Sequence, residues 1–207
     1  ALVESSFGGG TLTLSNASNS FGGLIFDFGT VAVTSAAAIG GGTITFRTFG
    51  TLELGAFVPT LANDIVVTGS GDLDSTAATT ALDGNISGSG NLRLFGDFTI
   101  DGANNGFDGV MSVVGSNRVV GDANSIGANT ATLVLWQSGL TSSAPGPLTL
   151  AQDITLEPFT TNFIGGANDI VLNGTVFDAG MNTTLLVGGV GGGIVTFADA
   201  NNRADFV

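Results

Sequence analysis

The feature that most constrains this chain is its similarity to itself. Displacing the sequence by 86 residues places residues 12–26 over residues 98–112. The identical pairs in this overlap are Thr13 and Thr99, Ala17 and Ala103, Asn19 and Asn105, Phe21 and Phe107, and Gly23 and Gly109. Self-similarity at a long period predicts a repeat architecture, in which successive units stack and share one apolar core.

Shorter matches at offsets of 89 and 90 residues extend the repetition, and an exact match at 105 residues indicates further self-similarity inside the repeat unit. They join residues 61–65 to 150–154, 82–84 to 172–174, and 62–66 to 167–171. A third copy begins with VTFADANN at residue 195, where Phe197 and Asn202 hold an apolar and a turn position. The sequence therefore predicts one continuous repeat segment over residues 1–207. Its copies of about 90 residues start near residues 8, 88 and 191, and the third is cut short.

Short runs that alternate apolar and polar residues predict strands with one buried face. Examples are TLTL at 11–14, TITF at 43–46, TLEL at 51–54 and NLRL at 91–94. Clusters of Gly, Asn, Asp and Ser separate these runs and are typical of turns. No helical periodicity is sustained, so the chain is expected to be all-β.

A 90-residue unit with many short strands is too long for one supersecondary element, and it predicts several coils of a parallel β-solenoid. At roughly 20 to 25 residues per coil, the chain would hold about nine coils. A strand spacing of ~4.8 Å then gives a rod on the order of 40 Å long. A single elongated core would run through it.

The residues of the copies have expected places in such a rod. Leu12, Leu14 and Ile100 should point inward and stack on residues of neighbouring coils, and Phe197 should do the same. Asn19, Asn105 and Asn202 should lie at corners, where Asn either bonds backbone groups, forms ladders or simply favours turns. Phe21 and Phe107 are expected to pack in the core or cap a corner, and Gly23 and Gly109 to allow close backbone approach.

This order of residues resembles a known repeat family. A glycine-rich lead-in at residues 8–10 is followed by the TLTL strand, by Asn16 to Asn19, by Phe21-Gly22-Gly23, and by a strand after Gly29. The pattern is similar to the autotransporter-associated β-strand repeat. The second copy departs from it by an insertion at residues 95–97 and by Asp108 in place of a glycine.

The resemblance implies a right-handed parallel β-helix in the passenger region of a type V secreted protein. Such proteins lie on the surface of Gram-negative bacteria and are exported across the outer membrane through a carboxy-terminal barrel, which this chain lacks. The resemblance therefore implies an extracellular location.

The charge balance limits the classes of partner that the chain can bind. Acidic residues number 17 against 4 basic ones, giving a net charge of −13. Coulomb repulsion then opposes binding to nucleic acid or to an anionic membrane surface. No run approaches the ~18 apolar residues of a membrane helix, so no membrane insertion by this segment is expected. No signal peptide is visible at Ala1, so one is expected to have been removed or to lie outside the segment.

The residue inventory disfavours catalysis. The chain has no His, Cys, Lys or Tyr, so the usual general bases and activated nucleophiles are missing. A pair of carboxylates could still serve a polysaccharide-cleaving enzyme. The conceivable acids are Glu53, Asp72, Asp74, Asp83, Glu157 and Asp178. Most acids stand beside turn-forming residues, which favours a solvated, non-catalytic role.

Two further features suggest ligands. The GSGDLD segment places Asp72 and Asp74 in a turn loosely similar to a calcium β-roll, but it occurs once, whereas calcium rolls use tandem copies. An exposed turn with two acids explains the segment better than a calcium site, so no cofactor is expected, and calcium at Asp72 and Asp74 is kept only as a weak alternative. The single Trp136 could stack on a sugar or pack at a sheet edge.

Three functions are therefore compared. The first is a structural or adhesive stalk segment that meets a host or neighbouring cell surface or a polysaccharide. The second is a fibre subunit, in which copies stack end to end. No polar capping segment is evident at either end, which is compatible with both. The third is a carbohydrate-active β-helix enzyme with a carboxylate pair.

Overall fold

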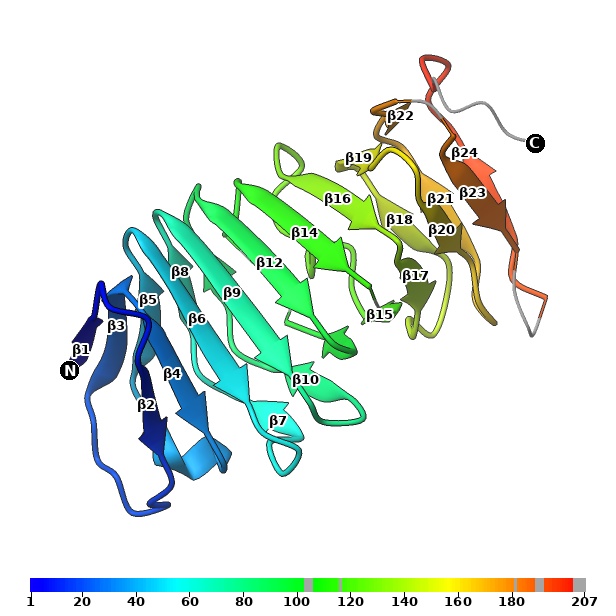
Figure 1. Ribbon diagram of the computed structural model, residues 1–207. Helices are drawn as coiled ribbons and strands as arrows, with labels where there is room; N and C mark the ends of the chain where they lie inside the picture. The colour runs from blue at the N-terminus through cyan, green and yellow to red at the C-terminus, as the bar shows by residue number, and fades with distance from the viewer. Residues whose placement is uncertain (103–105, 116, 181, 189–191, 203–207) are drawn as a thin grey trace.

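The computed structural model of the chain is a β-solenoid of about nine turns, and it describes residues 1–102, 106–115, 117–180, 182–188 and 192–202 (Figure 1). All its strand pairs for which a register is described are parallel. The strands stack into an elongated rod with β1 near one end and β23 and β24 near the other (Figure 1). The prediction of an all-β solenoid is confirmed. Within the described residues the helical content is the short 3-10 turn η1 (Ala36–Ala38), and no helix there could cross a membrane.

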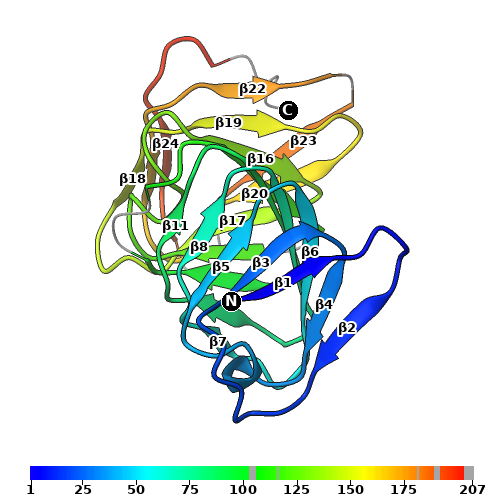
Figure 2. The same ribbon diagram turned by 90° about the vertical axis from the view of Figure 1, so that its left-hand side faces the viewer.

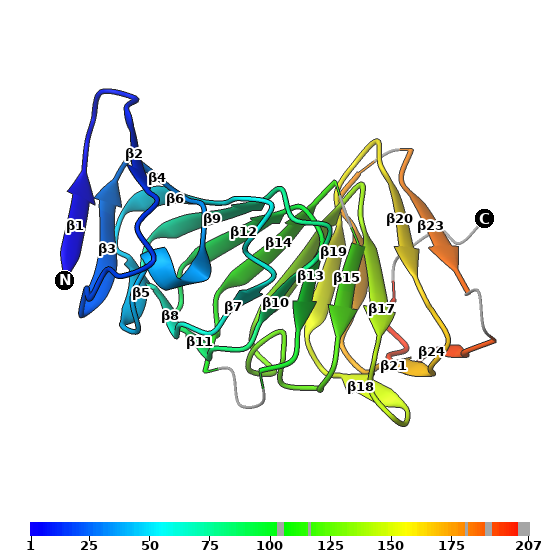
Figure 3. The same cartoon turned by 90° about the horizontal axis from the view of Figure 1, so that it is seen from below.

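Each full coil crosses three faces, which the end-on view separates (Figure 2). The first face contains a sheet of β1 (Leu2–Ser5), β3 (Gly23–Phe28), β5 (Thr43–Phe46), β8 (Ile65–Val67) and β11 (Ile86–Ser87). In later coils a separate three-stranded sheet of β18 (Leu148–Leu150), β21 (Ile170–Leu172) and β24 (Val195–Phe197) lies on the same side of the rod (Figure 3). The second face contains β2 (Thr11–Leu14), β4 (Thr30–Val33), β6 (Phe49–Leu54), β9 (Ser70–Ser75), β12 (Asn91–Phe95), β14 (Val110–Val114), β16 (Thr132–Trp136), β19 (Asp153–Leu156) and β22 (Val176–Asp178). The third face contains β7 (Thr60–Leu61), β10 (Thr80–Leu82), β13 (Phe98–Ile100), β15 (Asn117–Val120), β17 (Gly139–Ser142), β20 (Thr161–Ile164) and β23 (Thr184–Val187).

The register fixes the length of a coil. Thr51 pairs with Asp72, and Asp72 pairs with Arg93, so each of these coils takes 21 residues. The residue four coils after Leu12 in this register is Leu94, whereas the sequence similarity at 86 residues aligned Leu12 with Phe98. The similar segments 11–14 and 98–100 accordingly lie on the second and third faces. The 86-residue similarity therefore does not follow the stacking of the coils.

Phe21 and Phe107 differ in their surroundings for the same reason. Phe107 is fully buried and forms a bridge with Gly88, while Phe21 is only partly buried in the turn before β3. Alternating strands and Gly- or Asn-containing corners suit every face, so similar sequence can recur at non-equivalent corners. The exact pentapeptide ANDIV behaves differently, because both copies lead into first-face strands, β8 and β21 (Figure 3).

The core is a set of columns of inward side chains. Leu12 and Leu14 do point inward, but they are only partly buried because β2 is the first strand of the second face. Ile100 is fully buried in β13, and Phe197 is partly buried in β24. Burial of each large apolar side chain contributes roughly 1.5–3 kcal/mol.

Aromatic and glycine columns face each other inside the rod. Phe26 and Phe46 stack with ring centroids 4.8 Å apart and an interplanar angle of 13°. A Cβ atom placed on Gly50 would lie 2.6 Å from Phe26, and one on Gly71 would lie 2.5 Å from Phe46. The missing side chains of Gly50 and Gly71 thus provide the space that the two rings fill.

Side-chain amides and carboxylates bond neighbouring coils at the corners. Asn63 donates from Nδ2 to the carbonyls of Gly40 and Gly42, at 2.9 and 2.7 Å. The next residue, Asp64, accepts the backbone N–H of Asn85 in the following coil at 2.9 Å. The corner at residues 168–169 repeats this arrangement, which connects each ANDIV segment to the coils on both sides.

The predicted corner residues take varied roles. Asn19 donates from Nδ2 to the carbonyl of Ala38 at 2.8 Å, so it bonds a corner backbone group. Gly23 adopts φ 144°, and a Cβ there would lie 2.8 Å from the Thr43 carbonyl. Gly109 lies so close to the backbone of Gly90 that a Cβ would collide with it. Asn105 lies outside the described residues.

Candidate functional site

The outward side of the second face is the longest continuous sheet surface of the rod, with nine strands. Threonine, acidic and aromatic side chains alternate outward along it, while apolar partners point in. Trp136 and Phe177 are exposed to 52% and 44%, and Phe49 also lies open to solvent. This face therefore offers both aromatic rings and hydrogen-bonding groups to a ligand.

One group on this face is a charge pair. Asp72 and Arg93 are register partners on β9 and β12, and Arg93 donates from Nε and Nη2 to the two carboxylate oxygens at 2.7 and 2.6 Å. The guanidinium also lies 5.9 Å from the ring centre of Phe49 and 5.5 Å from that of Phe95. Such a two-pronged, ring-covered pair holds the Asp72 carboxylate against its arginine.

Asp74 lies on the same side of β9 as Asp72. Burial raises the pKa of Asp74, and the neighbouring Asp72 carboxylate raises it further. Its register partner on β6 is Glu53. The residues that the structure describes include no group of three or more acidic, His or Cys side chains that could hold a metal ion.

The remaining candidate acids are distributed along the rod. Asp83 follows β10 on the third face, and Glu157 follows β19 on the second. Asp178 is the last residue of β22, in register with the buried Leu156. The structure thus brings Glu53, Asp72 and Asp74 together on adjacent strands and places Asp83 and Asp178 elsewhere.

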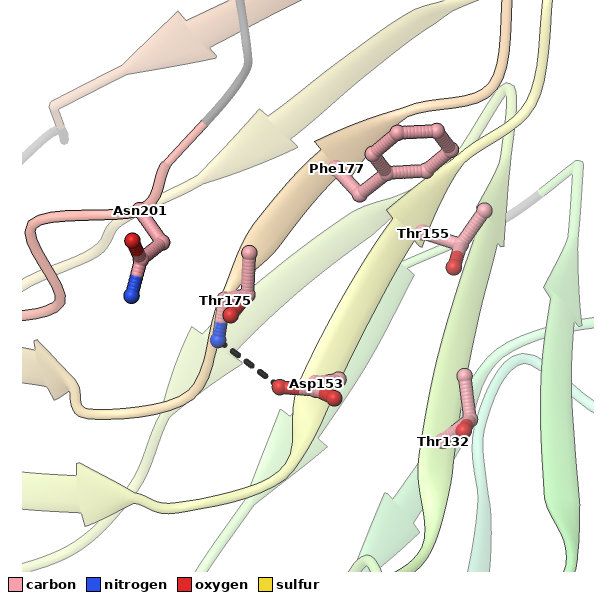
Figure 4. Close-up of a pocket in the computed structure, with 6 residues that line it drawn as sticks. All are labelled: Thr132, Asp153, Thr155, Thr175, Phe177 and Asn201. Carbon is pink, nitrogen blue, oxygen red and sulfur yellow. Dashed lines mark hydrogen bonds between the residues drawn. The ribbon is translucent and has the colours of Figure 1, made fainter.

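A hollow of ≈ 420 Å³ opens on the second face near the C-terminal end (Figure 4). Its lining is formed by Thr132, Asp153, Thr155, Thr175, Phe177 and Asn201. Thr132 and Asp153 are register partners in one outward column, and Thr155 and Phe177 are partners in the next. Since outward side chains of parallel strands stand in line, three successive coils build this hollow together.

Hydrogen bonds hold its polar wall in place. Asp153 accepts the N–H of Thr175 at 2.8 Å (Figure 4), and the Thr175 hydroxyl donates to Asp199 at 2.8 Å. Asn201 donates to Asp199 from its backbone and from its side chain, at 2.8 and 3.0 Å. The backbone N–H of Asn201, followed by the Thr175 hydroxyl, lowers the pKa of Asp199, so this carboxylate stays ionised and keeps its donors.

Sequence reasoning singled out Trp136 on this face but missed the hollow. Phe177 and Asp153 stand in outward positions of alternating strands, and an aromatic residue in such a position is a detectable signal. The meeting of Thr132, Asp153 and Thr175 depends on the coil register, which the 86-residue similarity did not supply.

Polar groups also occupy both ends of the rod. Glu4 in β1 pairs with the buried Phe26, and Asp178 in β22 pairs with the buried Leu156, so both acids stand in inward columns. Asn202 accepts the N–H of Val176 at 2.7 Å. Inside the rod a backbone carbonyl of the next coil fills that role, as Thr175 does for Ile154. Inward acids and a side-chain acceptor thus lie on the outermost described strands.

No family model, curated protein or solved structure matches the chain. The fold alone defines its class: the chain is a parallel β-solenoid, and this fold is consistent with a structural repeat protein.

Proposed function

We propose that the chain is a non-catalytic structural and adhesive stalk segment of an extracellular surface protein of the autotransporter type. The observation that carries this proposal is the single apolar core, which extends from Leu24 in β3 to Leu185 in β23. A rod that shares one core along its length extends without adding domains or linkers. Such a rod suits display of a surface at a distance from a cell.

The surface chemistry supports the same role. A net charge of −13 keeps the rod soluble and repels anionic partners. Cross-coil hydrogen bonds, such as those of Asn63 and Asp64, supply cohesion in a chain without cysteine. The repeat pattern quoted above supports export by the autotransporter route.

A non-catalytic role agrees with the chemistry of the acids. Asp72 is held by Arg93, and no His, Lys, Cys or Tyr is present to act beside Glu53 or Asp74. Neither Glu53→Gln nor Asp74→Asn should alter any measurable property other than stability. A polysaccharide-cleaving activity lost in one of these variants would replace the proposal with the enzyme hypothesis.

The stalk proposal is tested in two ways. Light scattering coupled to size-exclusion chromatography should give a monomer of 20.5 kDa that elutes earlier than a compact protein of that mass. An antibody against the segment should label intact cells of the source organism, and external protease should remove the label. Labelling only after cell lysis would refute the extracellular location.

A second candidate, an end-to-end fibre, is favoured by exposed apolar side chains at the ends. Val3 and Phe7 are exposed at one end, and Leu186 and Ile194 at the other. Against it, stacking would bury the Glu4 and Asp178 carboxylates, each of which has a backbone N–H donor but no ion pair among those found in the described residues, and burying such a charge is costly. Mass that rises with protein concentration in the same scattering experiment would favour the fibre over the stalk.

A further inference from the structure

We propose that the outward second face from β16 to β22 binds a neutral glycan, with Phe177 and Trp136 as its stacking residues. This inference rests on the adhesive role proposed above and specifies the ligand class of that surface. It starts from the hollow in Figure 4, which combines one exposed aromatic ring with hydroxyl, carboxylate and amide groups.

That combination matches the chemistry of a sugar. A pyranose ring presents a C–H face, which packs on an aromatic ring, and an edge of hydroxyl groups, which need donors and acceptors. Phe177 supplies the ring at one side of the hollow, and Asp153, Thr155 and Asn201 supply polar groups around it (Figure 4). Few polar groups converging beside an apolar surface are typical of small-ligand sites.

The polar groups are already oriented without a ligand. Asp153 uses Oδ1 to accept the Thr175 N–H, and a carboxylate retains further acceptor capacity on its two oxygens. Asn201 donates its side-chain N–H to Asp199, which leaves its carbonyl oxygen as an acceptor for a hydroxyl. Groups held in this way lose little conformational entropy on binding.

Trp136 extends the surface beyond the hollow. It occupies the outward side of β16, two strands away from Phe177 on β22, with β19 between them. Two strand spacings together with a displacement of two residues along the strand separate the two positions by about 12 Å, which is on the scale of a disaccharide unit of an extended chain. Val134 and Thr155 lie in the Phe177 column, whereas Trp136 stands two residues further along β16, in the adjacent outward column. An oligosaccharide that lies obliquely across β16, β19 and β22 can therefore contact both rings.

Charge selects the kind of glycan. The segment carries a net charge of −13, and Asp153 lines the hollow itself. Sulfated or uronic-acid chains would be repelled, whereas neutral hydroxyls can donate to the carboxylate. The ligand class is thus a neutral oligosaccharide or polysaccharide.

The chain offers its own optical probe. Trp136 is its single tryptophan and there is no tyrosine, so intrinsic emission reports on this site alone. Titration with neutral glucan, mannan and N-acetylhexosamine oligosaccharides should change the Trp136 emission saturably for at least one of them. Affinity electrophoresis in gels with the corresponding polysaccharides should show retardation.

Variants locate the site. Phe177→Ala and Trp136→Ala should each weaken retardation about tenfold, and Asp153→Asn should weaken it while keeping an acceptor for the Thr175 N–H. The matched control is Phe57→Ala, which removes a more exposed phenylalanine far along the chain and should leave binding unchanged. Circular dichroism melts must show each variant folded at the assay temperature.

Three results would overturn the proposal: no response to any neutral glycan by folded wild-type protein, equal loss in Phe57→Ala, or retardation only by polyanionic chains. If Trp136→Ala and Phe177→Ala instead reduce self-association, the face binds a second copy and the glycan assignment is wrong. Failure of glycan binding with a monomeric, cell-surface segment would leave the stalk proposal standing, so the two failures are distinguishable.

Discussion

The interior coils and the end coils of this rod differ in how fully their inward side chains are covered. In the interior, Leu52 and Leu73 are covered by register partners on both sides and are fully buried. At the ends, Leu12 keeps one covered side and is only partly buried. The same kind of residue in the same column thus contributes different stability according to the coil it occupies.

The ends compensate with polar chemistry. Glu4 and Asp178 stand where interior coils place Phe26 and Leu156, and Asn202 accepts the backbone N–H of Val176. These outermost described strands thus carry polar groups at positions where the neighbouring strand carries a buried apolar side chain or where a backbone carbonyl is the acceptor in the interior. The comparison teaches that the column pattern alone cannot give the stability of a coil, because the coverage of its two sides decides it.

The sharpest test places the same charge at the two kinds of coil. Leu54→Asp, in a fully buried interior position, should cost more than about 4 kcal/mol. Leu14→Asp, in the same column but on the first strand, should cost about 1 kcal/mol, because water reaches its side chain. Urea denaturation followed by circular dichroism measures both, and equal losses would abolish the distinction between interior and end.

Glycine substitutions test packing at the two places. Gly71→Ala would bring a methyl group to 2.5 Å from the Phe46 ring, and it should cost roughly 1–3 kcal/mol. Gly10→Ala is the matched end variant, since nothing lies within 4 Å of its Cβ position, and it should change stability by less than about 0.5 kcal/mol. A Gly71→Ala protein as stable as the wild type would mean that the aromatic stack can move aside.

Part of this fold could be predicted from sequence because its causes are local. Alternation in runs such as TLTL gives strands, and Gly with Asn gives corners, so the β-solenoid and the inward Leu12 and Leu14 followed directly. The coil register did not, because the same local chemistry suits every corner. The 86-residue match therefore aligned segments that lie on different faces of the rod. Of the sequence matches, only the exact ANDIV match aligned segments on the same face.

The candidate site was predictable only in part for the same reason. Trp136 stands out as a single residue, whereas Asp153 and Thr175 meet across coils that are 22 residues apart in register. In the sequence Glu4 and Asp178 also look like ordinary surface acids. Only the register shows that they stand in the same inward columns as the buried Phe26 and Leu156. In each case the missing information was the coil register, which determines which residues stack on one another.

Removing the end charges tests whether they keep the rods apart. The double variant Glu4→Leu with Asp178→Leu should remain folded, with a stability change below about 1 kcal/mol, but should associate as its concentration rises. Sedimentation velocity measures this. The control Glu53→Leu with Asp83→Leu makes the same charge change away from the ends and should stay monomeric. Association of both double variants alike would show that net charge, not end chemistry, prevents stacking.

The smallest expected effect separates an interior acid from an end acid by pH. The raised pKa of Asp74 means that ionisation weakens the fold, so the penalty is absent below its ordinary value of 3.8 and appears as pH rises through the folded pKa. Asp199 has a lowered pKa, so its contribution is present above 3.8 and is lost as pH falls through the folded pKa. Asp74→Asn should therefore raise the melting temperature at pH 7 by on the order of 1 °C, because water screens this exposed group.

Asp199→Asn should lower the melting temperature at pH 7, and this difference should shrink as pH falls below 3.8 and through the lowered pKa of Asp199. The Asp74→Asn difference should fade as pH falls below 3.8. Thermal melts of the two variants and the wild type between pH 3 and pH 7 measure these differences. A gain in Asp74→Asn that persists at pH 3, where the wild-type carboxyl is also neutral, would show that shape rather than charge is responsible. In that case the interior acid Asp74 and the end acid Asp199 would differ in packing alone, and the opposite shifts of their pKa values would not explain the difference in stability.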